Sequence, residues 1–124
     1  MKIVVAYGTE PYKVELLKQE YQMNVSYPEF NCSILYGVFD DKVLDLIYTM
    51  PFMANRRVVI LTVDTLKDLD NKAFYNLLEN PVVSTDFLII VRNYDNRLKI
   101  AKMLSKKRIS IPCNKFETLE EFAS

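Results

Sequence analysis

Residues 57–63 read Arg-Val-Val-Ile-Leu-Thr-Val, and this stretch decides the fold. The run is apolar at nearly every position and rich in β-branched side chains, without the alternation of a half-exposed strand. It therefore predicts a strand that is buried on both faces. Residues 86–91 (DFLIIV) repeat the pattern. Strands of this kind are typical of a parallel sheet that helices cover on each side.

Weaker strand and helix patterns alternate with these two runs along the chain. Further strands are expected at residues 2–7, 33–36 and 109–113, which makes five. Apolar side chains recur at helical spacing in four expected helices: Val14, Leu17 and Tyr21; Val43, Leu46, Ile47 and Met50; Phe74, Leu77 and Leu78, which are expected to face inward; Leu98, Ala101 and Leu104. The sequence predicts one three-layer α/β domain over residues 1–124, with a five-stranded parallel sheet and helices on both faces.

Cap and turn residues give the expected boundaries of these elements. Thr9 is expected to cap the first helix, with Glu10 and Pro11 in its first turn. Asp40 or Asp41 is expected to begin the second helix. The remaining expected segments are a polar loop at 24–32, an end to the second helix imposed by Pro51, a third helix at 71–79 and a basic helix at 96–107.

The composition excludes several classes of function. Sixteen basic and sixteen acidic residues cancel among 124, so the chain as a whole has no electrostatic attraction to nucleic acid. It contains no histidine, which excludes histidine-based acid–base catalysis and most zinc sites. No apolar run approaches the roughly 20 residues of a membrane span, and the first residues lack a signal peptide, so a cytoplasmic location is expected. Cys32 and Cys113 are expected to be reduced thiols.

The turn after the first expected strand, Gly8-Thr9-Glu10-Pro11-Tyr12-Lys13, occupies the position at which many α/β proteins bind phosphate. It lacks the GxxxxGK[ST] pattern. Glu10 would place a negative charge where a phosphate sits, and Pro11 removes an amide that would face it. A lone acid, Asp64, follows the third expected strand, and Asn93 is interpreted as a loop residue. The turn is therefore interpreted as structural, and a degenerate nucleotide-binding site is the alternative.

Two other candidate functions rest on weaker patterns. Six cations gather near the end of the chain: Arg97, Lys99, Lys102, Lys106, Lys107 and Arg108. No aromatic residue lies among them, so the pattern favours a solvated helix face over a nucleic-acid patch. A phosphoacceptor domain of flavodoxin-like order is disfavoured, because only Glu10 provides an acid near the end of the first strand.

The segment Thr49-Met50-Pro51-Phe52-Met53 joins a helix to a strand, where connections are normally polar. It carries Phe52 and Met53 directly after a proline. One interpretation is that both side chains fold back into the core. The other is that at least one projects as an anchor for a partner's pocket, since aromatic and methionine side chains are enriched in the cores of interfaces. The residues alone leave both interpretations open.

Several stretches, taken in order, resemble bacterial DNA polymerase III delta subunits. The GTEPY turn is similar to the start of that family, and Pro28-Glu29-Phe30-Asn31 is similar to its E-x-N element. Residues 49–59 (TMPFMANRRVV) resemble its T-L-P-F-x-x-x-R-R-hydrophobic stretch. The pattern Leu77-Leu78-Glu79-Asn80-Pro81, followed by Thr85 and LIIV, matches as well.

This resemblance implies the N-terminal AAA+-like domain of a clamp-loader subunit without a working nucleotide site or cofactor. It implies a non-catalytic part of the polymerase III holoenzyme that binds the sliding clamp (the beta subunit) and helps to open it during DNA replication. The implied clamp contacts are Phe52 and Met53, with Thr49, Met50 and Pro51 shaping the approach. Other loader subunits are implied partners, with DNA contacted only indirectly and no membrane. Lid and collar domains are expected to be absent, as in a truncated fragment.

Overall fold

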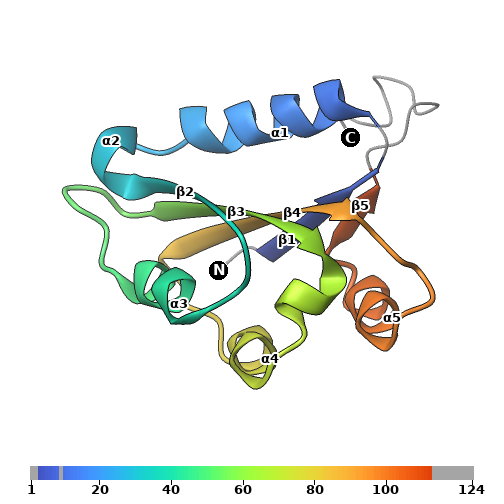
Figure 1. Ribbon diagram of the computed structural model, residues 1–124. Coiled ribbons are helices and arrows are strands. Elements are labelled where there is room, and N and C mark those ends of the chain that lie inside the picture. Colours follow the sequence, from blue (N-terminus) through green and yellow to red (C-terminus); the bar gives the residue numbers. More distant parts are fainter. Residues whose placement is uncertain (1–2, 9, 113–124) are drawn as a thin grey trace.

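The computed structural model describes residues 3–8 and 10–112 and contains one sheet of five strands. The strands are β1 (Ile3–Tyr7), β2 (Cys32–Tyr36), β3 (Arg57–Thr65), β4 (Thr85–Asn93) and β5 (Ser110–Pro112). Their order in the sheet is β2-β3-β4-β1-β5, and every neighbouring pair is parallel. The predicted five-stranded parallel sheet is therefore confirmed (Figure 1).

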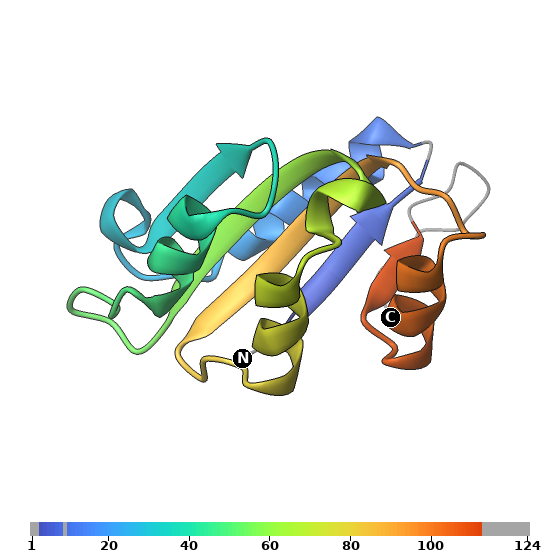
Figure 2. The same ribbon diagram turned by 60° about the horizontal axis from the view of Figure 1, so that its bottom comes forward.

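Helices cover both faces of this sheet. They are α1 (Pro11–Met23), α2 (Pro28–Asn31), α3 (Asp41–Tyr48), a 3-10 turn (Leu66–Leu69), α4 (Lys72–Glu79) and α5 (Lys99–Lys106). The long helix α1 lies across one face, and α3, α4 and α5 lie against the other (Figure 1). Figure 2 shows these three helices side by side across the strands. The three-layer α/β prediction is confirmed.

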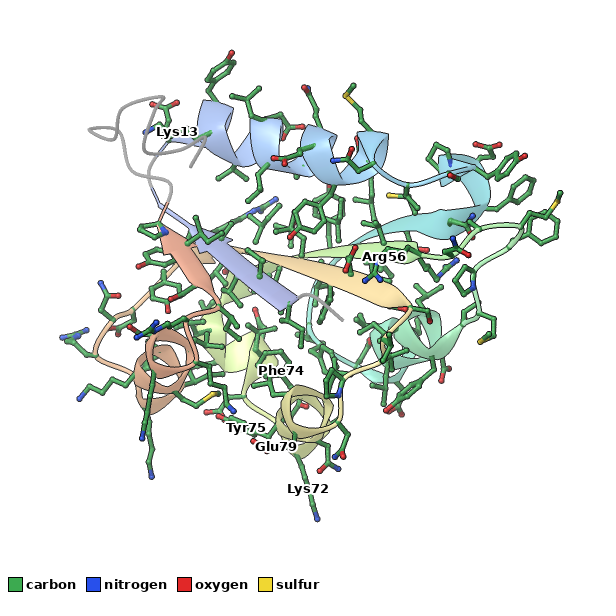
Figure 3. The ribbon with its side chains drawn as sticks, turned by 180° about the vertical axis from the view of Figure 1, so that it is seen from behind. Lys13, Arg56, Lys72, Phe74, Tyr75 and Glu79 are labelled. Atoms are coloured by element: carbon green, nitrogen blue, oxygen red, sulfur yellow. The ribbon has the colours of Figure 1, made fainter. Side chains whose placement is uncertain are left out.

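Two apolar cores lie on the two faces of the sheet, because successive strand residues point to opposite sides. In β3, Val59 and Leu61 pack toward α3 and α4, while Val58 and Ile60 pack toward α1. Phe74 points from α4 toward the sheet, on the opposite side of that helix from Lys72 (Figure 3). Burial on both faces explains why β3 and β4 are continuous apolar runs rather than alternating ones.

Three predicted boundaries are wrong. The cap of α1 is Glu10 rather than Thr9, because the residue before a proline is held extended and Pro11 is the first helical residue. Thr9 itself lies outside the described residues. The expected loop at 24–32 contains the one-turn helix α2, in which Pro28 starts the turn. Met50 is not part of the second helix, because α3 ends at Tyr48, and its side chain is 77% exposed.

Other predicted boundaries shift by a few residues. The basic helix begins at Lys99 rather than 96, with Leu98 at its N-cap, and the last strand ends at Pro112 within the described part of the chain. Cys113 lies outside the described residues. Apart from Met50, the apolar residues predicted at helical spacing all belong to a core or pack against one. They are Val14, Leu17, Tyr21, Val43, Leu46, Ile47, Phe74, Leu77, Leu78, Leu98, Ala101 and Leu104.

Thr85 gives a first testable link between α3 and the sheet. Its buried hydroxyl donates a hydrogen bond of 2.7 Å to the carbonyl oxygen of Ile47. Replacing Thr85 with valine keeps the shape but leaves that carbonyl without its donor, so we expect the free energy of unfolding to fall by about 1–2 kcal/mol. Thr62→Val is the matched control, since no hydrogen bond to another described residue involves the Thr62 hydroxyl. Equal losses in the two variants, measured by chemical denaturation, would contradict this role.

Candidate protein-binding site

The segment that connects α3 to β3 presents large apolar side chains to solvent. We call residues 49–53 the anchor segment. The side chains of Phe52 and Met53 are 53% and 72% exposed, so the interpretation that both fold back into the core is wrong. The segment lies at the edge of the sheet where β2 and β3 begin, beside α2 (Figure 1). In parallel sheets this edge is opposite to the one at which ligands usually bind.

The side chain of Asn31 ties the anchor segment to the end of α2. Its Oδ1 accepts a hydrogen bond of 2.7 Å from the backbone N–H of Phe52, and its Nδ2 donates one of 2.9 Å to the carbonyl oxygen of Phe52. A third hydrogen bond, of 2.8 Å, runs from Nδ2 to the carbonyl oxygen of Ser26. Asn31 is fully buried. Both backbone polar groups of Phe52 are therefore fixed by one side chain.

An aromatic contact extends the apolar surface from the anchor segment to α2. The ring centroids of Phe30 and Phe52 lie 5.1 Å apart with the planes tilted by 56°, a favourable arrangement for an aromatic pair. Both rings are about half exposed. The two segments thus present one continuous apolar surface.

Arg57, the first residue of β3, holds the elements beneath this surface together. Its guanidinium donates hydrogen bonds to the carbonyl oxygens of Leu46 (3.0 Å) and Phe30 (2.8 Å) and to the hydroxyl of Ser33 (2.8 Å). The side chain joins α3, α2 and β2 and is only 5% exposed. Burial raises the pKa of the nearby Cys32 thiol, which the charge of Arg57 only partly opposes. This thiol is free, and the raised pKa favours its protonated form.

The neighbouring Arg56 has a different role. It forms a two-pronged ion pair with Asp86 of β4. This pair is partly exposed, and its side-chain hydrogen bond raises the pKa of Arg56. The two adjacent arginines therefore differ in burial and in partners.

Backbone strain is found in the two segments that Asn31 joins. Among the described residues, three that are not glycine have positive φ: Tyr27 (52°), Met53 (52°) and Arg108 (58°). Such a conformation costs an L-residue on the order of 1–2 kcal/mol. Tyr27 precedes α2, and Met53 follows Phe52. Strain of this kind persists only where surrounding contacts enforce it.

The turn after β1 lies at the other end of the sheet, where the parallel strands finish. Oε1 of Glu10 accepts a hydrogen bond of 3.2 Å from the backbone N–H of Tyr12, so a carboxylate occupies the start of α1. Asn93, the last residue of β4 rather than a loop residue, donates to the Asp64 carboxylate at 3.2 Å.

A cavity of about 420 Å³ opens beside Gly8. Among the described residues, no cluster of acidic and cysteine side chains is placed to hold a metal ion.

The basic segment is solvated. All six of its cations are exposed: Arg97, Lys99, Lys102, Lys106, Lys107 and Arg108. Arg97 pairs with Asp95 at 3.0 Å, and hydrogen bonds from Arg97 lower the pKa of that carboxyl. Lys107 approaches Glu79 of α4 at 3.4 Å. These pairs agree with the interpretation of a solvated helix face.

Sequence reasoning missed two residues of the site. Apart from its place in the E-x-N element of the resemblance, nothing in the sequence marks Asn31 as part of the site. The same holds for Phe30, which precedes Asn31 in that element. Their link to the anchor segment spans 21 residues, which no local pattern reveals. By contrast, the structure places Phe52, Met53, Met50, Pro51 and Thr49 together, as expected for consecutive residues.

Comparison with known proteins identifies the family to which this α/β domain belongs. Residues 5–114 match the family model of the DNA polymerase III delta subunit. The chain therefore belongs to the DNA polymerase III delta subunit family, and the resemblance of its motifs is confirmed. No curated protein matches the chain.

A solved structure has the same fold. The Bacillus subtilis DNA clamp loader delta protein (YqeN) superposes with a TM-score of 0.75 at 23% sequence identity. The match covers 94% of this chain and 39% of that protein, so this chain spans well under half of the length of its structural neighbour. Within the described residues, no helix has the length and apolar character needed to cross a membrane.

Proposed function

We propose that this chain is a non-catalytic clamp-loader module that binds the sliding clamp through the anchor segment and helps to open it during DNA replication. The observation that supports this most is the exposure of Phe52 and Met53 on a backbone fixed by a buried side chain. Exposed apolar side chains held in one conformation bind without paying the full cost of ordering a loop. Membership of the delta-subunit family and the clamp-loader neighbour suggest the partner.

In this proposal the residues of the anchor segment have distinct roles. Phe52 and Met53 insert into an apolar pocket of the clamp, and methionine adapts to irregular pockets. Pro51 restricts the backbone before them, and Met50 adds exposed apolar surface. The Thr49 hydroxyl donates to the carbonyl oxygen of Asp45 at 2.8 Å, which ties the first residue of the segment to α3. Other loader subunits are further partners, DNA is contacted only indirectly, and the location is cytoplasmic.

The direct test is binding to the clamp of the same organism. The 124-residue chain is passed over the immobilised sliding clamp, and saturable binding is expected. Absence of binding at the highest soluble concentration would contradict the proposal.

A degenerate nucleotide site is the second candidate, and the cavity beside Gly8 is the observation that favours it. We expect titration of ATP and magnesium into the chain to give no heat above dilution. The Glu10 carboxylate lies where a phosphate would bind, and Pro11 offers no amide to it. The measurement is isothermal calorimetry, and a saturable heat would favour the nucleotide-binding alternative.

A further inference from the structure

We infer that Asn31 is a positioning residue for clamp binding, which fixes the backbone of the anchor segment so that Phe52 and Met53 face the partner together. This inference rests on the proposed function and deepens it, because it assigns a role to a residue that is buried and cannot touch the partner. It also makes α2 part of the binding site.

The hydrogen bonds of Asn31 define its amide orientation without ambiguity. Both Nδ2 protons are used, one by the Phe52 carbonyl at 2.9 Å and one by the Ser26 carbonyl at 2.8 Å. Oδ1 faces the Phe52 N–H at 2.7 Å. A flipped amide would set Oδ1 against two carbonyl oxygens. An aspartate there would accept but not donate, so only an amide of this length satisfies all three backbone groups.

The anchor segment depends on this link. Within the described part of the chain, the other side-chain hydrogen bond of the segment is that of Thr49 to Asp45, which is local to α3. Met53 holds a positive φ of 52° directly after the fixed residue Phe52. Without Asn31 the segment is free to relax toward commoner backbone conformations. The fraction of chains with both anchors correctly placed then falls, and the apparent affinity falls by the same factor.

The geometry of the α2 turn determines where Asn31 lies. Tyr27 adopts a φ of 52°, and Pro28 begins the turn, so the chain reverses within four residues. The backbone N–H groups of Phe30 and Asn31 both donate to the carbonyl oxygen of Tyr27, at 2.9 Å each. The Arg57 guanidinium donates a hydrogen bond to the carbonyl oxygen of Phe30, the residue before Asn31. Hydrogen bonds to Tyr27 and from Arg57 therefore fix the backbone around Asn31, independently of its own side-chain contacts with the anchor segment.

The experiment compares Asn31→Ala with Asn71→Ala in the 124-residue chain. Asn71 is a matched control, since its side chain also accepts from a backbone N–H (Phe74, 3.0 Å) and donates to a carbonyl (Phe39, 3.0 Å). We expect both variants to lose several degrees of thermal midpoint. Affinity for the immobilised clamp is expected to fall about tenfold in Asn31→Ala and to stay within twofold in Asn71→Ala.

A coupling measurement separates positioning from general destabilisation. In a chain that already carries Phe52→Ala, adding Asn31→Ala is expected to weaken clamp binding by less than threefold, because the main anchor is gone. A full tenfold loss in that background, or wild-type affinity in Asn31→Ala alone, would overturn the inference. Failure of the wild-type chain to bind the clamp would instead contradict the proposed function.

A measurement on the wild-type chain covers the case in which Asn31→Ala does not fold. Hydrogen exchange followed by NMR is expected to show the Phe52 amide protected at least tenfold more than the Met53 amide of the same segment. Equal exchange rates at the two amides would show that the link to Asn31 does not persist in solution, and the inference would be abandoned.

Discussion

Replacing Phe52 and Met53 together by serine is expected to weaken binding to the sliding clamp by about a thousandfold, while the fold survives. Two buried apolar anchors at an interface contribute about 2 kcal/mol each, and about 1.4 kcal/mol corresponds to a factor of ten. Neither side chain belongs to the core of the free chain. The readout is equilibrium binding to immobilised clamp, with circular dichroism to verify the fold.

A matched control removes a comparable amount of exposed apolar surface elsewhere. Tyr12 and Met23 lie at the two ends of α1; Tyr12 is more exposed than Phe52, and Met23 is more exposed than Met53. Tyr12→Ser with Met23→Ser is expected to leave clamp affinity within twofold of the wild type. If the anchor variant bound as tightly as this control, the anchor segment would not be the contact.

Arg57→Ala is expected to have the largest effect on stability, a loss of about 3–4 kcal/mol in the free energy of unfolding. Hydrogen bonds from a charged donor contribute more than neutral ones, and here three partly buried acceptors lose the guanidinium donor at once. Arg57→Lys keeps the charge but lacks the planar fork, so we expect it to recover only part of the loss. Urea denaturation gives these values directly.

The adjacent arginine provides the control for this prediction. Arg56→Ala breaks the partly exposed pair with Asp86 and is expected to cost about 1 kcal/mol or less. Similar losses at the two positions would mean that burial of the guanidinium is not what makes Arg57 important.

The sheet is predictable from the sequence because its signals are local and strong. The runs in β3 and β4 are long and apolar, since both faces of these strands are buried, and Asp40 and Asn71 cap α3 and α4 through side-chain hydrogen bonds that short sequence patterns anticipate. The sequence places the cap of α1 one residue too early, because two polar residues, Thr9 and Glu10, precede Pro11. There the restriction that proline imposes on its predecessor decided the outcome.

Only part of the candidate site can be predicted from the sequence, because some of its residues are recognisable only by contacts between distant segments. Phe52 and Met53 stand out because large apolar residues are unusual in a connection. Asn31 stands in a polar stretch where asparagine is ordinary, and its role arises only when α2 and the anchor segment meet in space. Arg57 belongs to a recognisable motif, but its contacts with three separate elements cannot be predicted from the sequence.

The position of β1 within the sheet has a consequence for how the chain folds during synthesis. Although β1 is made first, its two neighbours are β4 and β5, which are made last. Ile3 pairs in register with Phe87, so the first strand cannot pair with β4 until residue 87 has left the ribosome. The unit β2-α3-β3, by contrast, joins strands that are consecutive along the chain. The anchor segment lies within this unit, so its hydrogen bonds with Asn31 can form before β1 has its partners.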